Sequence, residues 1–167
     1  MADETERIAW PLEIVTGGQT GVDRAALDVA IEHAIPCSGW CPHGGWAEDF
    51  TEPPGLLAKY PMLRETPLAD PAQRTEWNVR DSDALLILVD GRGAKVSKGT
   101  DLAIRSAERY AKPYLLVSLA DTGAVDKVAA WLQAKQPRKL GVGGPRESEV
   151  PGIYPAAKRF LVQVLAG

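Results

Sequence analysis

Residues 14–31 contain the feature that most constrains this chain: an apolar strand-like stretch, a glycine-rich turn and a helix-like stretch in direct succession. The turn is Gly17-Gly18-Gln19-Thr20-Gly21, and the helix-like part begins at Val22. Backbone N–H groups at a helix start have no partner within the helix, and the helix dipole favours negative charge there. Glycines let an anion approach the backbone closely. The segment therefore predicts an α/β fold with an anion-binding site.

The turn matches neither standard nucleotide-binding fingerprint. It lacks the G-x-G-x-x-G spacing of dinucleotide-binding turns and the G-x-x-x-x-G-K-[ST] spacing of phosphate loops. Gln19 and Thr20 add an amide and a hydroxyl that can donate hydrogen bonds. A plainer interpretation also stands, in which Thr20 is the N-cap of the helix and Asp23 its reciprocal partner, with no ligand.

Length and charge narrow the class of protein. A chain of 167 residues predicts one domain over residues 1–167, with residues 1–10 as a flexible N-terminus. The net charge of −3, with acidic and basic residues interspersed, argues against a nucleic-acid binder, which normally carries a basic stripe. Neither a signal peptide nor an apolar run of about 20 residues is present, so we expect no membrane association and a cytoplasmic location.

The two cysteines do not predict a metal site. Cys37, Cys41 and His43 supply two thiols and one imidazole, one ligand short of a closed zinc site, and their spacing is not that of a zinc ribbon. In a cytoplasmic chain such cysteines are usually reduced and often buried. We therefore expect no metal ligands.

Hydrophobic periodicity alternates between strand-like and helix-like stretches. It predicts strands at residues 12–16, 35–40, 62–65, 84–89, 114–119 and 140–142, and helices at residues 22–34, 71–82, 101–111, 125–134 and 154–165. This alternation is typical of a single Rossmann-like, doubly wound, mainly parallel sheet of about six strands with helices on both faces.

Three glycine-rich turns begin at Gly17, Gly91 and Gly143, each directly after a predicted strand. The loops that follow parallel strands share one edge of the sheet, and ligands bind there at the topological switch point. We therefore expect the three turns to gather around one ligand. The long loop at 41–55 is also expected to be functional or mobile.

Four motifs, in order along the chain, resemble the molybdenum (molybdopterin) cofactor carrier family. They are residues 17–21 with 23–27, residues 39–42 with 47–49, residues 73–83, and residues 144–148 with 151–154. The resemblance implies a Rossmann-like fold of the lysine-decarboxylase-like and phosphoribohydrolase superfamily, and a homo-oligomer, either a dimer or a tetramer. It also implies that the cargo is molybdenum cofactor, a phosphate-bearing pterin, and that a molybdoenzyme receives it.

The cargo's chemistry assigns roles to the matching residues. Backbone N–H groups of Gly18–Gly21, Gly99 and Thr100 suit a phosphate, molybdate or sulfate, and Arg74 or Arg146 could add a forked contact. Glu76 and Asn78 could contact the pterin edge. Trp77 could stack on the ring, although core packing is the plainer interpretation. The expected binding residues are Gly17, Gly18, Gln19, Thr20, Gly21, Asp23, Arg24, Arg74, Glu76, Asn78, Ser97, Lys98, Gly99, Thr100, Arg146, Glu147 and Ser148.

The chain departs from the family and from its enzymatic relatives around residues 91–103. Extra residues at 91–96 precede Ser97-Lys98-Gly99-Thr100, where the family commonly has a Ser-Gly-Gly-Thr-like turn. The superfamily's phosphoribohydrolases carry a glutamate three residues after the threonine of their Gly-Thr pair, and here that position is Ala103. Glycosidic cleavage needs a positioned carboxylate. We therefore expect a binding protein without catalytic residues; the alternatives are a nucleotide-binding protein and a phosphoribohydrolase-like enzyme acting on nucleoside monophosphates.

Overall fold

The computed structural model describes residues 8–167, and its centre is a six-stranded sheet in which every strand pair is parallel. The strand order is β3-β2-β1-β6-β4-β5. The strands are β1 (Glu13–Val15), β2 (Cys37–Cys41), β3 (Leu63–Glu65), β4 (Ala84–Val89), β5 (Tyr114–Ser118) and β6 (Lys139–Gly143). The predicted fold class is confirmed, and the bounds of β4 agree with the prediction at both ends.

Strands β4 and β6 lie side by side within the sheet and are largely buried. All six residues of β4 are apolar and buried, as a parallel strand between two helix layers requires. β6 lies between β1 and β4, so that Leu140 pairs with Ile14 on one side and with Ala84 on the other. The last strand of the chain therefore joins the two halves of the sheet.

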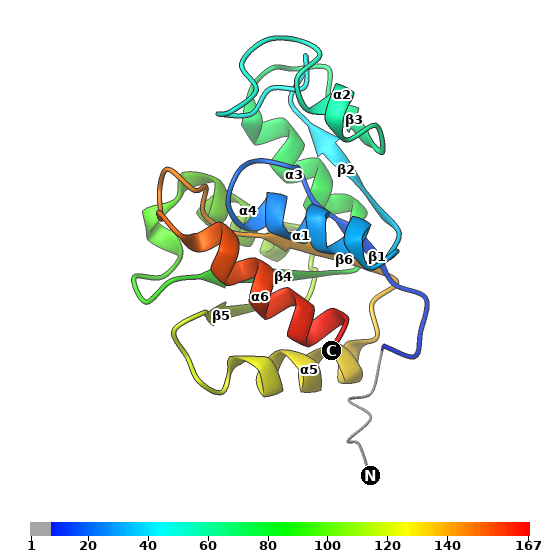
Figure 1. The fold of residues 1–167 in the computed structure, drawn as a ribbon, viewed down its shortest axis with the longest axis vertical. Helices are drawn as coiled ribbons and strands as arrows, with labels where there is room; N and C mark the ends of the chain where they lie inside the picture. The colour runs from blue at the N-terminus through cyan, green and yellow to red at the C-terminus, as the bar shows by residue number, and fades with distance from the viewer. Residues whose placement is uncertain (1–7) are drawn as a thin grey trace.

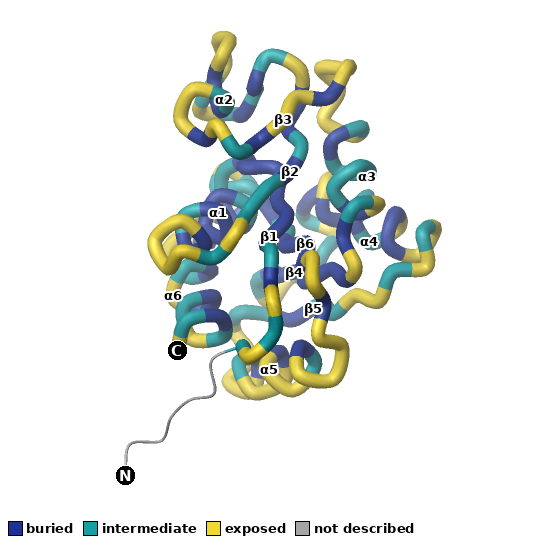
Figure 2. The backbone as a smooth tube through the Cα atoms, turned by 90° about the vertical axis from the view of Figure 1, so that its right-hand side faces the viewer, coloured by how far each residue is buried: buried dark blue, intermediate teal, exposed yellow. Residues whose placement is uncertain are grey.

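Helices cover both faces of the sheet (Figure 1). Helices α1, α5 and α6 lie on one face, and α3 and α4 on the other, with the strands between them (Figures 1 and 2). The largest group of buried apolar side chains lies between the sheet and α1, α5 and α6. The helices are α1 (Val22–Glu32), α2 (Leu56–Lys59), α3 (Pro71–Asp81), α4 (Lys98–Arg109), α5 (Ala124–Lys135) and α6 (Ile153–Leu165), with a 3-10 turn η1 (Ala94–Val96).

The start of α4 and the cap of α1 differ from what the sequence suggested, whereas α1 itself begins at Val22 as predicted. Helix α4 begins at Lys98, three residues before the predicted start at residue 101. The Ser97 hydroxyl caps it by accepting the Thr100 N–H at 3.2 Å. The predicted N-cap of α1, Thr20, is wrong: the cap residue is Gly21, with no side-chain cap. The hydroxyl of Thr20 instead donates to Glu48 in the loop that follows β2.

The predicted flexible N-terminus falls largely on residues 1–7, which lie outside the described residues. Ile8 and Trp10, at the end of that range, pack against the main core, and the flexibility of the segment stays a prediction. The indole N–H of Trp10 also donates to Pro137 O at 2.9 Å. Across residues 8–167, none of the helices combines the length and apolar character that a bilayer crossing demands.

Candidate functional site

A cavity of about 430 Å³ opens at the carboxyl edge of the sheet, where β1 and β6 end, and extends along the sheet to Leu85 of β4. Its wall combines Gly17 after β1, Gly143 at the end of β6, residues 97–100 at the start of α4, and one side of α3. This is the topological switch point, because the chain continues from β1 toward β2 on one side and from β4 toward β5 on the other. The volume lies within the ordinary range of small-molecule sites.

The structure brings part of the expected binding set together on this wall. The residues that line the cavity are Gly17, Gln19, Asp23, Arg74, Asn78, Ser97, Lys98, Gly99, Thr100 and Arg146. The other expected residues lie outside the wall: Gly18, Thr20, Gly21, Arg24, Glu76, Glu147 and Ser148. All three glycine-rich loops reach the wall: the first through Gly17 and Gln19, the second through residues 97–100 at its end, and the third through residues 143, 144 and 146.

The start of α4 presents unused polar groups to the cavity. The backbone N–H groups of Lys98 and Gly99 precede the first intrahelical bond. Thr100 is 1% exposed, and in residues 8–167 its Oγ1 is the one fully buried side-chain polar atom without a hydrogen-bond partner. A Cβ added at Gly99 would find its nearest neighbour 3.9 Å away, so space remains in front of this backbone. A buried hydroxyl without a partner is costly unless a ligand satisfies it.

A buried arginine faces the same cavity from α3. Arg74 is 8% exposed, and in the described chain its guanidinium makes one hydrogen bond, from Nη1 to Gly17 O at 3.3 Å. Its nearest carboxylate, Asp23, lies 4.0 Å away. Burial lowers the pKa of the Arg74 guanidinium, although the nearby Asp23 carboxylate raises it. Most of its five donors therefore have no hydrogen-bond partner in the described chain.

Burial also changes the pKa of Asp23, the carboxyl group nearest to Arg74. It raises the pKa of Asp23 to about 6, an effect that the positive charges of Arg74 and Arg24 only partly offset. The cavity floor thus holds one permanent cation and one carboxyl group that titrates close to neutral pH.

Two further cations reach the cavity differently. Arg146 is engaged within its own loop: its N–H and Nε donate to Glu149 Oε1 at 2.9 and 3.3 Å, and its Nη1 lies 3.7 Å from Glu48. Lys98 is exposed and forms no ion pair among the described residues. Of these two, Lys98 has its full charge available for an anion.

The start of α1, which the sequence singles out, is closed. Val22 donates its N–H to Pro145 O at 3.3 Å, and a Cβ at Gly21 would lie 2.2 Å from the same oxygen. The Thr20 hydroxyl donates to Glu48 and accepts from the Glu147 N–H at 3.2 Å. The loop after β6 therefore occupies the place at this helix start where an anion was expected.

Other expected residues hold loops together. Glu147 accepts the Tyr154 N–H at 2.9 Å near the start of α6, and the Ser148 hydroxyl donates to Glu48 at 2.6 Å. Arg24 forms two hydrogen bonds of 2.8 Å with Asp49.

Two α3 residues expected at a pterin edge are also engaged within the protein. Glu76 accepts a hydrogen bond from the Tyr110 hydroxyl at 2.7 Å. Asn78 pairs with the backbone of Trp40, accepting its N–H at 2.8 Å and donating to its carbonyl oxygen at 2.9 Å. Neither amide nor carboxylate is thus free of protein partners.

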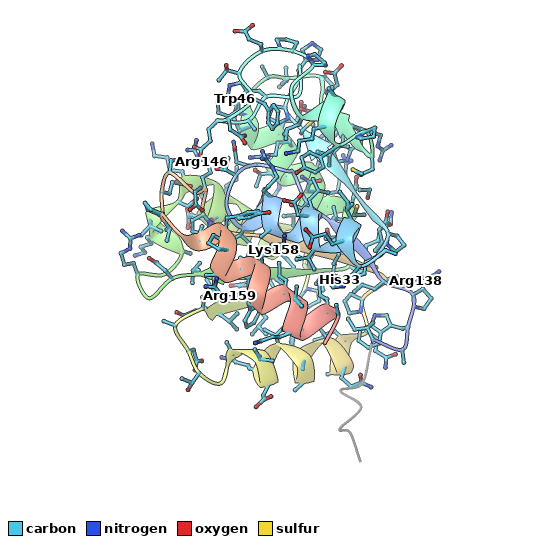
Figure 3. All side chains as sticks on the ribbon, viewed as in Figure 1. His33, Trp46, Arg138, Arg146, Lys158 and Arg159 are labelled. Carbon is cyan, nitrogen blue, oxygen red and sulfur yellow. The ribbon has the colours of Figure 1, made fainter. Side chains whose placement is uncertain are left out.

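Trp46, which is labelled in Figure 3, is the aromatic residue among those that line the cavity, and it is not one of the residues expected there from the sequence. Trp77 lies elsewhere, edge-on to Trp40 with ring centroids 4.9 Å apart and with Arg80 over its face. Trp77 is half-buried against Trp40 and belongs to none of the hydrophobic core clusters among the described residues, so the core packing offered as its plainer interpretation is not what this position shows. A tryptophan inside a glycine-rich loop was the available signal for Trp46, but the sequence does not state which way such a loop folds.

Neither cysteine belongs to a ligand cluster. Within residues 8–167 no group of three or more histidine, cysteine, aspartate or glutamate side chains is close enough to hold a metal ion. Cys41 is buried, and burial raises the pKa of its thiol to about 11. This thiol is therefore protonated and unreactive near neutral pH.

Comparison with known proteins agrees with the motif resemblance. The sequence profile of the circularly permutated YpsA SLOG family matches residues 14–165. A crystal structure described as a "Putative molybdenum carrier protein" from Syntrophus aciditrophicus SB superimposes with a TM-score of 0.83 at 38% identity, covering 94% of this chain and 96% of the other. No curated protein matches the chain. On fold, motifs and profile, this chain belongs to the circularly permutated YpsA SLOG family.

Proposed function

We propose that this protein binds and carries a molybdenum-containing pterin cofactor, and that its cavity holds the cofactor's phosphate. The observation that carries the proposal is the buried, unpartnered Oγ1 of Thr100 at the start of α4. An oxyanion there would accept hydrogen bonds from this hydroxyl and from the N–H groups of Lys98 and Gly99. The similar protein from Syntrophus aciditrophicus is described as a molybdenum carrier, which favours this cargo over other anions.

The charges near the start of α4 suit an oxyanion. Arg74 supplies a buried guanidinium on the same cavity, and Lys98 adds an unpaired ammonium at its rim. Charge-assisted hydrogen bonds of this kind are about twice as strong as neutral ones. Because Asp23 partly compensates Arg74, the cavity floor stays close to neutral until a ligand arrives.

The direct test is to purify the protein from a host that makes molybdenum cofactor and to measure bound molybdenum together with the fluorescence of the oxidised pterin. Calorimetric titration with molybdate and with inorganic phosphate then measures the anion site alone. Thr100→Val, which keeps the side chain's shape, is expected to weaken anion binding about tenfold. Arg109→Ala is the matched control, because Arg109 is an exposed cation outside the cavity wall.

Absence of pterin and molybdenum from the purified protein, together with no binding of either anion, would contradict the proposal. Equal binding by the wild type and by both Thr100→Val and Arg74→Gln would also contradict it, because the anion would then lie elsewhere. The recipient is proposed to be a molybdoenzyme, and the carrier a cytoplasmic homo-oligomer; size-exclusion chromatography with light scattering tests the oligomer.

One observation favours an enzymatic alternative. Asp23 faces the cavity with its pKa raised by burial to about 6, as is common for general acids and bases. Ala103 also lines the cavity, at the position where the phosphoribohydrolases carry their glutamate. Release of ribose 5-phosphate from AMP by the wild type, and its loss in Asp23→Asn, would establish hydrolysis as the function instead.

A further inference from the structure

The five tryptophans of this chain fall into three environments. Trp10 and Trp131 pack against the main hydrophobic core, and Trp40 and Trp77 pack on each other. Trp46 lines the cavity, is half-buried and belongs to none of the hydrophobic clusters among the described residues. Because a large aromatic side chain normally gains its stabilisation by burial against apolar neighbours, this position needs another explanation.

The backbone on either side of this tryptophan is held in place. Leu56 donates its N–H to Gly45 O at 2.8 Å, and Ala47 and Phe50 exchange N–H to carbonyl bonds of 3.1 and 3.0 Å. Gly45 has a φ of +70°, a conformation that favours glycine. The chain therefore fixes where the indole leaves the backbone.

The two residues after Ala47 fasten the same loop to the rim of the cavity. Glu48 donates its N–H to Gln19 Oε1 at 3.0 Å and accepts the Ser148 hydroxyl at 2.6 Å. Asp49 binds Arg24 through two hydrogen bonds of 2.8 Å. The loop thus joins the turn after β1 to the turn after β6, and the indole is presented without a segment having to order on binding.

The remainder of the cavity suits the flat body of a ligand. Apolar side chains line it together with the tryptophan, namely Val15, Val79, Leu85, Leu102, Ala103 and Val142. The polar groups gather instead at the start of α4 and at Arg74. An aromatic platform beside an anion site fits a planar heterocycle that carries a phosphate, since stacking and phosphate contacts act on different parts of such a ligand.

We propose that Trp46 is the specificity-determining residue of this site, stacking on the heteroaromatic ring of a ligand whose anionic group lies at the start of α4. This inference rests on the proposed function, because it assumes that the anion occupies the same cavity. It separates two contributions to affinity: the start of α4 and Arg74 bind the charge, and Trp46 selects ligands that carry a ring. Trp77 has no part in binding.

The test uses one probe with a ring and one without. The phosphate ester of 6-hydroxymethylpterin and inorganic phosphate are titrated calorimetrically into the wild type, Trp46→Ala, Trp46→Phe and Trp77→Ala. Trp46→Ala is expected to bind the pterin phosphate about tenfold more weakly and inorganic phosphate as the wild type does. Trp46→Phe is expected to retain most of the affinity, and Trp77→Ala all of it. Quenching of tryptophan fluorescence by the pterin is expected to survive in Trp77→Ala.

Several results would overturn the inference. If Trp46→Ala binds the pterin phosphate as tightly as the wild type, no stacking occurs. If it loses affinity for both probes equally, Trp46 only supports the loop; near-wild-type affinity in Trp46→Phe distinguishes the stacking role from general disruption. A wild type that binds phosphate but gains nothing from the ring refutes this inference alone. A wild type that binds neither probe refutes the proposed function as well.

Discussion

The starts of α1 and α4 are both helix N-termini that follow a glycine-bearing loop at the same edge of the sheet, yet they are built for different purposes. At α1 the N–H of Val22 binds Pro145 O, and Thr20 is hydrogen-bonded to Glu48 and Glu147. At α4 Thr100 Oγ1 has no hydrogen-bond partner among residues 8–167, and space remains in front of Gly99. A glycine-rich helix start is therefore not a binding site in itself. What distinguishes the two is whether another loop of the protein has already taken the polar groups.

The largest expected effect comes from placing a methyl group at the closed helix start. Gly21→Ala forces an alanine to a φ of +82° and puts its Cβ 2.2 Å from Pro145 O. We expect a loss of stability of about 3 kcal/mol or more, seen as a Tm lower by about 6 °C or more in calorimetry. A Tm within a degree of the wild type would show that the loop after β6 does not seal α1.

The next effect tests the buried carboxyl group of Asp23, in the first turn of α1. The pKa of Asp23 is about 6 when folded and 3.8 as its ordinary value, so the folded protein binds the proton more tightly. The stability from this group is complete below pH 3.8 and is lost as the pH rises through about 6. Urea unfolding measures the free energy of unfolding of the wild type and of Asp23→Asn. Between about pH 4 and 8, the difference between the two is expected to decrease by at most roughly 3 kcal/mol. A difference that does not change with pH would contradict this.

A matched pair of threonine substitutions should give opposite signs. Thr20→Val removes two hydrogen bonds at the start of α1, and we expect it to lower the free energy of unfolding by about 1–2 kcal/mol. Thr100→Val removes a buried hydroxyl that has no partner, so it is expected to be neutral or stabilising by about 1 kcal/mol. Denaturant midpoints measured without ligand check both. Destabilisation by Thr100→Val would mean that the hydroxyl is satisfied in the free protein.

The smallest effect on stability is expected at the open helix start. Gly99→Ala places a Cβ 3.9 Å from its nearest neighbour and replaces a glycine inside a helix, so stability should change by less than about 1 kcal/mol. Its methyl group would stand where an anion approaches the backbone, so phosphate affinity should fall several-fold in calorimetry. Unchanged affinity in a folded Gly99→Ala protein would place the anion away from α4.

The sequence predicted the sheet well because hydrophobic period and glycine turns are local signals. The continuous apolar run at 84–89 required a strand covered on both faces, and the structure has it there. The start of α4 was misplaced although its signal was available, since Ser97 stands three residues before Thr100 in the manner of an N-cap.

Which residues of the candidate site face the cavity, and which bind other parts of the protein, could not be predicted in the same way. Whether Thr20 and Glu147 face a ligand or each other depends on how two loops, 127 residues apart in sequence, meet at the sheet edge. The same holds for Trp46 and Trp77: their identities suggest stacking, but only tertiary packing determines that Trp77 meets Trp40 while Trp46 meets the cavity. These are contacts between residues distant in sequence, which a local sequence pattern does not determine.

The central position of β6 has a consequence for how the molecule is made. Because β6 pairs with both β1 and β4, a nascent chain that ends before residue 139 has two half-sheets with no strand to join them. Contacts this distant in sequence form slowly and late in folding. The cavity, whose wall includes Gly143 and Gly144, can therefore arise only once residues 139–144 have been added to the growing chain. Under the proposed function, truncated or stalled products that end before these residues would hold no ligand, because part of the cavity wall would be missing.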